Sequence, residues 1–237
     1  MMDNISYNSY ESKINSILES IKNQFIRLPY YFFNEYEFHY WLRTKLNEFR
    51  RGRRNYLNMK IKGEFPTSHR FSKNKNTGLK FIDDENGRLG HIDLVIQMED
   101  VGNIGFEFYF GKENQITEVH HNDDFYFLHK RYLSLKEIEI HTLNDLLKLK
   151  NENDLKFSYI ILLIATLHEN ERKRKNFVDK KRKKIISMLK KFKNDLPNNI
   201  KIIYVEKGYI NDFLHGEREE YYAIANNDND GPFYSRY

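Results

Sequence analysis

Apolar positions at helical spacing predict several helices along the chain. They recur over residues 5–27, and Leu28–Pro29 ends that predicted helix because the residue before a proline disfavours the helical conformation. A second helix is predicted from Asn34, a favourable N-cap, to about Phe49. Three further helices are predicted over residues 116–133, 140–150 and 171–193.

Between these helices the pattern changes to that of strands. Residues 56–65 are predicted to be extended, with Pro66 as the stop, and the polar residues 72–90 to form a loop or the end of a long hairpin. The apolar run over residues 159–165 indicates a strand buried on both faces. Further strands are predicted over residues 91–98, 104–110 and 200–205. Strands that alternate with helices predict an α/β class, with a mixed central β-sheet flanked by helices.

The length of 237 residues bounds the domain organisation. We predict an N-terminal helix over residues 1–29, one α/β domain over residues 30–215 and a polar, flexible tail over residues 216–237. The absence of cysteine excludes disulfides, cysteine-ligated zinc and a thiol nucleophile. Because the chain has neither a long apolar run nor an apolar segment of the signal-peptide type, we expect a cytoplasmic protein with no membrane partner.

Positive charge is concentrated in two segments, although the net charge is only +5. Residues 171–193 hold twelve basic and two acidic side chains, and a second basic stretch runs from Arg43 to Lys62. Clustered cations attract polyanions, so nucleic acid is the predicted partner, although a lysine-rich helix can also be a plain solvated face. The predicted contacts are Arg50, Arg51, Arg53, Arg54, Arg172, Lys173, Arg174 and Lys175.

Two acidic residues are predicted to share one side of neighbouring strands. Side chains alternate along a strand, so Asp93 shares a face with His91, and Glu107 shares a face with Tyr109. If the two strands form a hairpin with their apolar faces together, both acids lie on the same side. Such carboxylates repel unless a cation or proton lies between them, and hard oxygen ligands suit Mg²⁺ or Mn²⁺. His91 could assist the metal or be structural.

Two further acids are candidates for the same site. Glu35 lies on the inward, apolar side of the second predicted helix, where an acid needs a partner or a metal, although it could simply cap the first turn. Glu64, in the segment GEFPTSHR, lies near a predicted strand end. It is either a fourth acid of the site or one half of a surface salt bridge.

Together these segments resemble the PD-(D/E)XK nuclease superfamily, which has a restriction-endonuclease-like fold. The similarity covers about residues 30–205, with Glu35 in NEYEFHYWL, Asp93 in GHIDLVI and Glu107 in IGFEFYFG. It implies a metal-dependent nuclease that hydrolyses DNA phosphodiester bonds, such as one of a mobile element or defence system. Asp93, Glu107 and the carbonyl of Phe108 would hold Mg²⁺ or Mn²⁺, and Glu35 would assist.

One position departs from the family pattern. Two residues after Glu107 the family has a lysine, which is taken to position the attacking water, but this chain has Tyr109, whose phenol is neutral at pH 7. A lysine from elsewhere would have to reach the site. Lys112 is the nearest in sequence, and Lys130, on the following predicted helix, is the second candidate.

Two other functions stay open at this point. The chain could be a catalytically inactive nuclease-fold protein that binds nucleic acid or a protein partner, or an unrelated α/β interaction protein whose acids align by chance. The phosphate loops of nucleotide-binding proteins and the nucleophile elbow of serine hydrolases are absent from the sequence. A homodimer is possible, as in many double-strand-cutting nucleases of this fold, but the sequence has no dimer signature.

Overall fold

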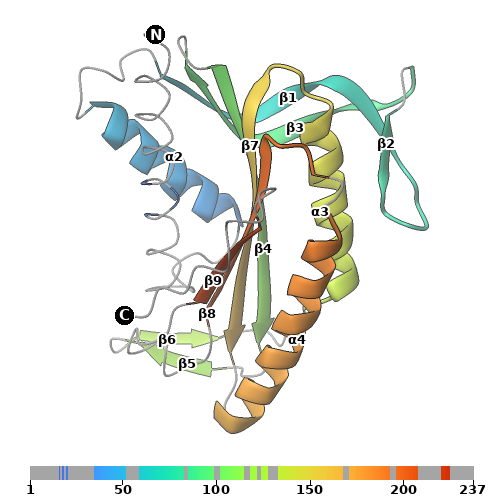
Figure 1. Cartoon of the computed structure of the whole chain (residues 1–237). Helices are drawn as coiled ribbons and strands as arrows, with labels where there is room; N and C mark the ends of the chain where they lie inside the picture. Colours follow the sequence, from blue (N-terminus) through green and yellow to red (C-terminus); the bar gives the residue numbers. More distant parts are fainter. Residues whose placement is uncertain are drawn as a thin grey trace.

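The structure is a computed structural model, and in its described part a mixed β-sheet lies between helices (Figure 1). It describes residues 16, 18, 20, 35–51, 59–82, 85–98, 102–114, 118–121, 124–127, 133–167, 171–192, 196–207 and 220–224. Of the predicted N-terminal helix, only Ser16, Leu18 and Ser20 are described, and each is helical. Leu18 packs against the core of the domain.

The main sheet has seven strands in the order β2-β1-β3-β4-β7-β8-β9. The strands β4, β7 and β8 pair in parallel, and the other pairs are antiparallel. The predicted α/β class with a mixed sheet is therefore confirmed. The strands are β1 (Lys60–Lys73), β2 (Lys80–Ile82), β3 (Arg88–Met98), β4 (Gly102–Asn114), β7 (Leu155–Leu167), β8 (Ile200–Lys207) and β9 (Glu220–Ile224).

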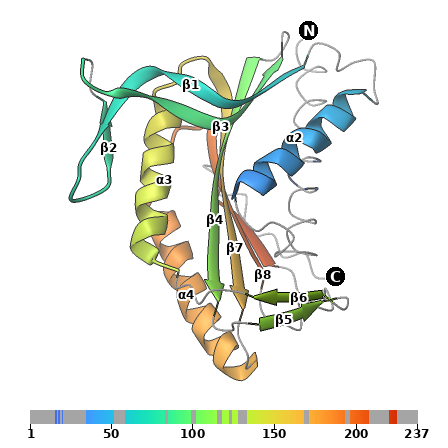
Figure 2. The same cartoon turned by 180° about the vertical axis from the view of Figure 1, so that it is seen from behind.

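Helices cover both faces of this sheet, α2 (Glu35–Arg51) on one side and α3 (Leu135–Lys150) with α4 (Glu171–Phe192) on the other (Figures 1 and 2). The protein has two hydrophobic cores, one on each face of the sheet, because successive side chains along a strand point to opposite faces. On β4, Phe106 and Phe108 pack with α2, whereas Tyr109 packs with the residues of α3 and α4. None of the described helices is long and apolar enough to cross a membrane.

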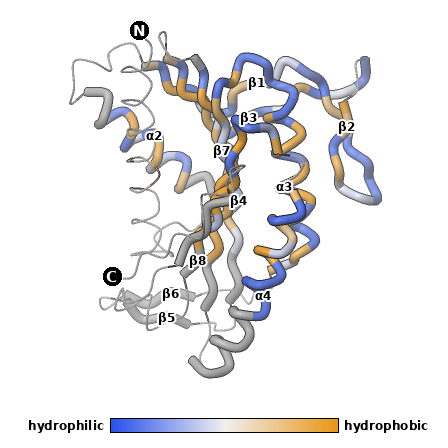
Figure 3. Tube along the Cα trace, viewed as in Figure 1, coloured by the Kyte–Doolittle hydropathy of each residue, from blue (hydrophilic) through white to orange (hydrophobic). Residues whose placement is uncertain are grey.

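The strand β7 is buried on both faces, as its continuous apolar sequence predicts. Ile161 and Leu163 belong to the core under α2, and Ile160 and Leu162 belong to the core under α3 and α4. Figure 3 shows the apolar positions concentrated along these central strands. Burial of each such side chain contributes about 1.5–3 kcal/mol to the stability of the fold, and β7 contributes to both cores.

The prediction that Pro66 ends a strand is wrong, because β1 continues to Lys73. Proline lacks a backbone N–H, and here it lies at an irregularity where the β1–β3 register shifts between Pro66 and Arg70. Thr67 Oγ1 donates to the carbonyl oxygen of Gly90 at 3.2 Å across this irregularity. Of the two alternatives predicted for residues 72–90, a loop or the end of a long hairpin, the structure shows the hairpin: β1 pairs with β2, and the first residues of β3 follow.

The prediction of a helix over residues 116–133 is also wrong in its described part. The segments β5 (Glu118–His121) and β6 (Asp124–Phe127) pair as antiparallel strands. Their sequences, EVHH and DFYF, contain a β-branched residue and three aromatics, which favour strands, and the sequence between them is Asn-Asp, a typical turn pair. These local preferences are stronger here than the helical spacing.

Two further boundaries differ from expectation. The helix α3 begins at Leu135 instead of residue 140, because Ser134 acts as N-cap and its Oγ accepts a hydrogen bond from the N–H of Glu137 at 3.3 Å. In the tail that was expected to be flexible, Glu220–Ile224 form β9 at the edge of the sheet. Its sequence EYYAI has the aromatic and β-branched residues of a strand.

Gly111 on β4 provides a test of this packing. A Cβ atom at Gly111 would lie 2.7 Å from Leu133 Cδ1 and 2.8 Å from Ile164 Cδ1. We therefore expect Gly111→Ala to lower the free energy of unfolding by about 1–3 kcal/mol, measured by denaturant titration. Gly63→Ala is the control, since its Cβ would meet only the flexible end of the Arg43 side chain. Equal destabilisation by both variants would contradict this account.

Candidate metal centre

The strands β3 and β4 stop pairing beside Asp93. Their last pair at this end is Leu94 with Phe106. Beyond it, the backbone N–H of Phe108 donates to Asp93 Oδ2 at 2.7 Å. This bond satisfies a backbone donor in the interior of the sheet and fixes the direction of the carboxylate.

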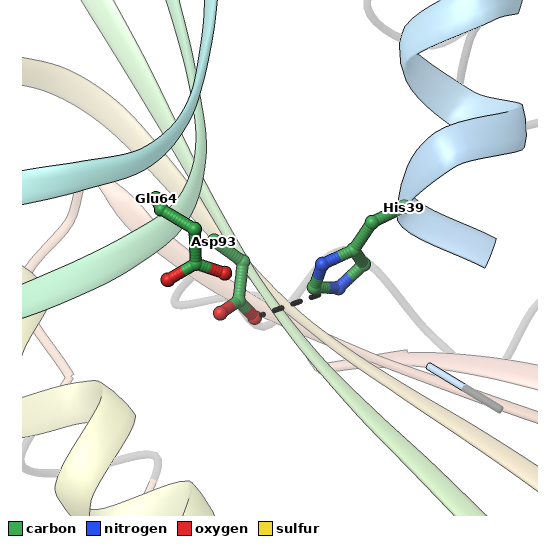
Figure 4. Close-up of side chains that lie close together, drawn as sticks. All are labelled: His39, Glu64 and Asp93. Atoms are coloured by element: carbon green, nitrogen blue, oxygen red, sulfur yellow. Dashed lines mark ion pairs between the residues drawn. The ribbon is translucent and has the colours of Figure 1, made fainter. Parts of the chain in front are cut away.

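Two more side chains that can bind a metal approach Asp93, as Figure 4 shows. Glu64 on β1 lies between the pairs Gly63–Leu94 and Phe65–Ile92, and so directly across from Asp93. His39 comes from α2, and its Nε2 lies 3.9 Å from Asp93 Oδ2. One ligand atom from each of His39, Glu64 and Asp93 lies within 4.8 Å of the other two.

This arrangement fits a divalent cation. Two atoms bound to one ion at about 2.0–2.6 Å can be up to roughly 4–5 Å apart, so the three side chains need little movement to share an ion. Without a cation, Glu64 and Asp93 are like charges directly opposite each other on an antiparallel pair, which is destabilising. Glu64 also has a φ of 49°, a left-handed conformation that is uncommon for a residue other than glycine.

The electrostatics of His39 also suit a metal ligand. Burial lowers the pKa of His39 to about 4, although the charge of Glu64 opposes this shift. The imidazole is therefore neutral at pH 7, which is the form that donates a nitrogen lone pair to a metal.

A second group of charges lies on the α3 side of Asp93. Lys148 Nζ forms an ion pair with Glu107 Oε1, lies 3.1 Å from Asp145 Oδ1 and donates to the carbonyl oxygen of His91 at 3.0 Å. All three charged side chains are buried, with relative exposures of 5% for Lys148, 1% for Glu107 and 6% for Asp145. We call Glu107, Asp145 and Lys148 the ion cluster.

The charges of the ion cluster act on one another, and the charge of Asp93 acts on all three. Burial raises the pKa of Glu107, and the charges of Asp145 and Asp93 raise it further, against the effect of Lys148. Burial and Asp93 also raise the pKa of Asp145. Burial opposes the charged form of Lys148, but Asp145 and Glu107 together raise its pKa above the ordinary value, so its ammonium is charged at pH 7. Asp93 therefore lies close enough for its charge to disfavour ionisation of both buried acids.

A second lysine approaches the ion cluster on the β1–β2 hairpin. Buried Asn144 holds this hairpin against α3, because its Oδ1 accepts from the N–H of Lys80 at 2.6 Å and its Nδ2 donates to the carbonyl oxygen of Gly78 at 3.1 Å. The side chain of Lys80 is half-buried. Burial and the charge of Lys148 lower the pKa of Lys80.

The structure brings together some of the residues that the sequence predicts for the site. Asp93 and Glu64 meet directly, whereas Glu107 pairs with Lys148 outside this group of three ligands, although the charge of Asp93 raises its pKa. His91 is exposed and contributes its backbone carbonyl to Lys148. Tyr109 is buried against the ring of His141, at 5.1 Å between centroids, and provides no cation.

Other residues predicted for the site have side chains outside the described part of the structure. Glu35 is the first residue of α2, and Lys112 lies on β4, but the side chains of both are outside the described part. The same holds for the side chains of Arg50 and Arg51 on α2 and of Arg172, Lys173, Arg174 and Lys175 on α4. Arg53, Arg54 and Lys130 lie outside the described residues altogether.

Three residues of this site were missed by the sequence reasoning. His39 is one helical turn after Glu35 on the same helix, so the spacing of i and i+4 could have indicated it. Asp145 and Lys148 are three residues apart on α3 and read like an ordinary surface ion pair. No signal in the sequence shows that they are buried.

Comparison of the chain with protein-family models, with curated proteins and with solved structures found no match. Function is therefore inferred from the residues of this site.

Proposed function

We propose that this chain is a divalent-metal-dependent nuclease that hydrolyses DNA phosphodiester bonds. The observation that carries the proposal is the buried ammonium of Lys148 beside Glu107. It comes from α3 and supports the idea that a relocated lysine replaces the one that Tyr109 displaces from β4. The fold class agrees with a restriction-endonuclease-like arrangement, which is part of the same proposal.

Each residue has a distinct role in this proposal. Asp93 anchors the cation, and the N–H of Phe108 holds its carboxylate in place. A cation bound there would stabilise negative charge on the phosphate and lower the pKa of a bound water. Lys148 supplies a fixed positive charge next to the acids, where charge develops on the phosphate during hydrolysis. Glu107 and Asp145 keep this ammonium charged in a buried place.

The exposed face of α4 would bind the DNA backbone. Its side chains Ile185, Leu189 and Phe192 are buried, and five exposed lysines lie away from them. Clustered lysines attract phosphates without reading sequence. The exposed lysines are Lys180, Lys183, Lys184, Lys190 and Lys191.

Neutralising this face should weaken DNA binding. For the triple variant Lys180→Gln, Lys183→Gln and Lys184→Gln, we expect the negative slope of log K against log salt concentration to become shallower by about 0.9 for each lost phosphate contact. Fluorescence anisotropy with a labelled duplex measures this slope. The control changes three exposed lysines elsewhere, namely Lys136, Lys150 and Lys156. An equal effect of both triple variants would show that α4 has no special part in binding.

The direct test of the proposal is a cleavage assay. The wild-type chain is incubated with plasmid and with single-stranded DNA in the presence of Mg²⁺, Mn²⁺ or EDTA. We expect cleavage that requires a divalent cation, stops with EDTA and co-elutes with the protein in size-exclusion chromatography. If neither cation supports cleavage of either substrate, the nuclease proposal is wrong.

One observation favours a second function, that of an inactive nuclease-fold protein that binds nucleic acid. An ammonium has three donors, and all three donors of Lys148 can be used by Glu107, Asp145 and the carbonyl of His91. In an active enzyme, a phosphate or a water would have to replace one of these contacts. Salt-sensitive DNA binding without any cleavage would support this second function.

A further inference from the structure

We propose that the cation of this site is a first-row transition-metal ion such as Mn²⁺, held by His39, Glu64 and Asp93, and not Mg²⁺ held by Asp93 and Glu107. This inference deepens the proposed function and rests on it for any part in cleavage. Cation binding is measured without cleavage, so the experiment can contradict the metal site and the nuclease function independently.

The three side chains are positioned to share one ion. They come from α2, β1 and β3, yet their ligand atoms lie within 4.8 Å of one another. Glu64 is exposed, and His39 and Asp93 each retain 16% side-chain exposure, so an ion can enter from solvent and keep bound water. Figure 4 shows the two carboxylates and the imidazole directed toward one another.

Phe108 positions two of the three ligands. Its backbone N–H holds the carboxylate of Asp93. Its ring lies 5.1 Å from the ring of His39 between centroids, and Phe38 contacts both rings. The imidazole is therefore held between aromatic side chains before an ion binds. Such preorganisation is what a metal site requires.

Glu107 is not one of the metal ligands. Its side chain is 1% exposed and forms an ion pair with Lys148 on the α3 side of the sheet. Moving it to an ion at Asp93 would leave the buried ammonium with one fewer carboxylate, which is costly. Glu107 thus acts as counter-ion of Lys148.

The ligand atoms also select the kind of ion. Mg²⁺ prefers oxygen ligands in near-ideal octahedral geometry and keeps several waters. An imidazole nitrogen suits transition metals, which bind mixed nitrogen and oxygen ligands. A site of one nitrogen and two carboxylates therefore favours Mn²⁺ over Mg²⁺, in contrast to a site made of Asp93 and Glu107 alone.

The experiment measures ion binding by isothermal titration calorimetry on the metal-free chain. We expect Mn²⁺ to bind at least about tenfold more tightly than Mg²⁺. His39→Asn should lower the Mn²⁺ affinity at least about tenfold and change Mg²⁺ binding much less. His91→Asn is the matched control, since it makes the same change at an exposed histidine on β3 outside the three ligands. Glu107→Gln should change the Mn²⁺ affinity much less than His39→Asn does, because Glu107 contributes its charge but no ligand atom.

A spectroscopic measurement on the wild type does not depend on the folding of any variant. Pulsed electron paramagnetic resonance of bound Mn²⁺ should show coupling to an imidazole ¹⁴N nucleus. Absence of this coupling, equal affinity for Mn²⁺ and Mg²⁺, or equal loss in His39→Asn and His91→Asn would each overturn the inference. Mn²⁺ binding with ¹⁴N coupling but without cleavage would uphold the site and contradict only the nuclease function.

Discussion

Replacing Asp93 by asparagine is expected to lower the rate of DNA cleavage at least about 100-fold while the fold stays intact. Asparagine has the same shape, and its Oδ1 can still accept the hydrogen bond from the N–H of Phe108. Only the negative charge is lost, together with the ability to anchor a divalent cation beside Glu64 and His39. Single-turnover cleavage rates and thermal unfolding measure the two effects.

The matched control for this variant is Asp154→Asn. Asp154 is an exposed acid in the turn between α3 and β7. We expect this variant to keep the wild-type rate and melting temperature, because surface substitutions change stability little. An Asp93→Asn protein that cleaves as fast as the wild type would remove Asp93 from the reaction, and the nuclease proposal would then fail.

The sequence predicts the centre of the sheet well because its strands are fully buried. The run over residues 159–165 can only be satisfied between two layers, and β7 lies between two cores. On β4, the alternation of Phe106 and Phe108 with Glu107 predicts correctly which side chains share a face. In these segments local pattern and tertiary packing agree.

The sequence predicts secondary structure wrongly where the conformation of a segment depends on the strand with which it pairs. Pro66 is a strong local stop signal, yet β1 passes through it because pairing with β3 accommodates a register shift there. The segment that contains β5 and β6 has both helical spacing and strand-forming residues, and the pairing of His121 with Asp124 shows that the hairpin is preferred. Periodicity alone does not resolve such a conflict.

The same limit applies to the site: residues marked by a local sequence pattern are predictable, and residues brought in by tertiary packing are not. Strand alternation is a local pattern, so the sequence predicts Asp93 and Glu107 as candidates. The split of β3 from β4, which directs Asp93 toward both His39 and the ion cluster, is a property of the whole sheet. Lys148 is 41 residues from Glu107 in the sequence, and only the packing of α3 on β4 brings them together. A motif search that expects a lysine two residues after the acid cannot find it.

Lys148→Met is expected to lower the free energy of unfolding at pH 7 by about 3–5 kcal/mol, because it leaves Glu107 and Asp145 buried without a counter-ion. Burial already raises the pKa of both acids, and loss of the ammonium raises it further. Both acids are protonated in the folded and unfolded states at low pH. The difference in free energy of unfolding between the wild type and Lys148→Met should therefore be smallest below about pH 4 and grow as the pH rises toward 7. Urea unfolding across this range measures it.

Two further variants test whether the loss of stability comes from the unpaired buried acids or from losing any lysine on this helix. Lys150→Met changes an exposed lysine two residues away and should shift stability by at most about 0.5 kcal/mol. The triple variant Glu107→Gln, Asp145→Asn and Lys148→Met removes all three buried charges, so it should recover most of the lost stability, to within about 1–2 kcal/mol of the wild type. It should nevertheless fail to cleave DNA, because the ammonium is absent. A stable Lys148→Met protein without any pH-dependent deficit would show that these three charges do not depend on one another.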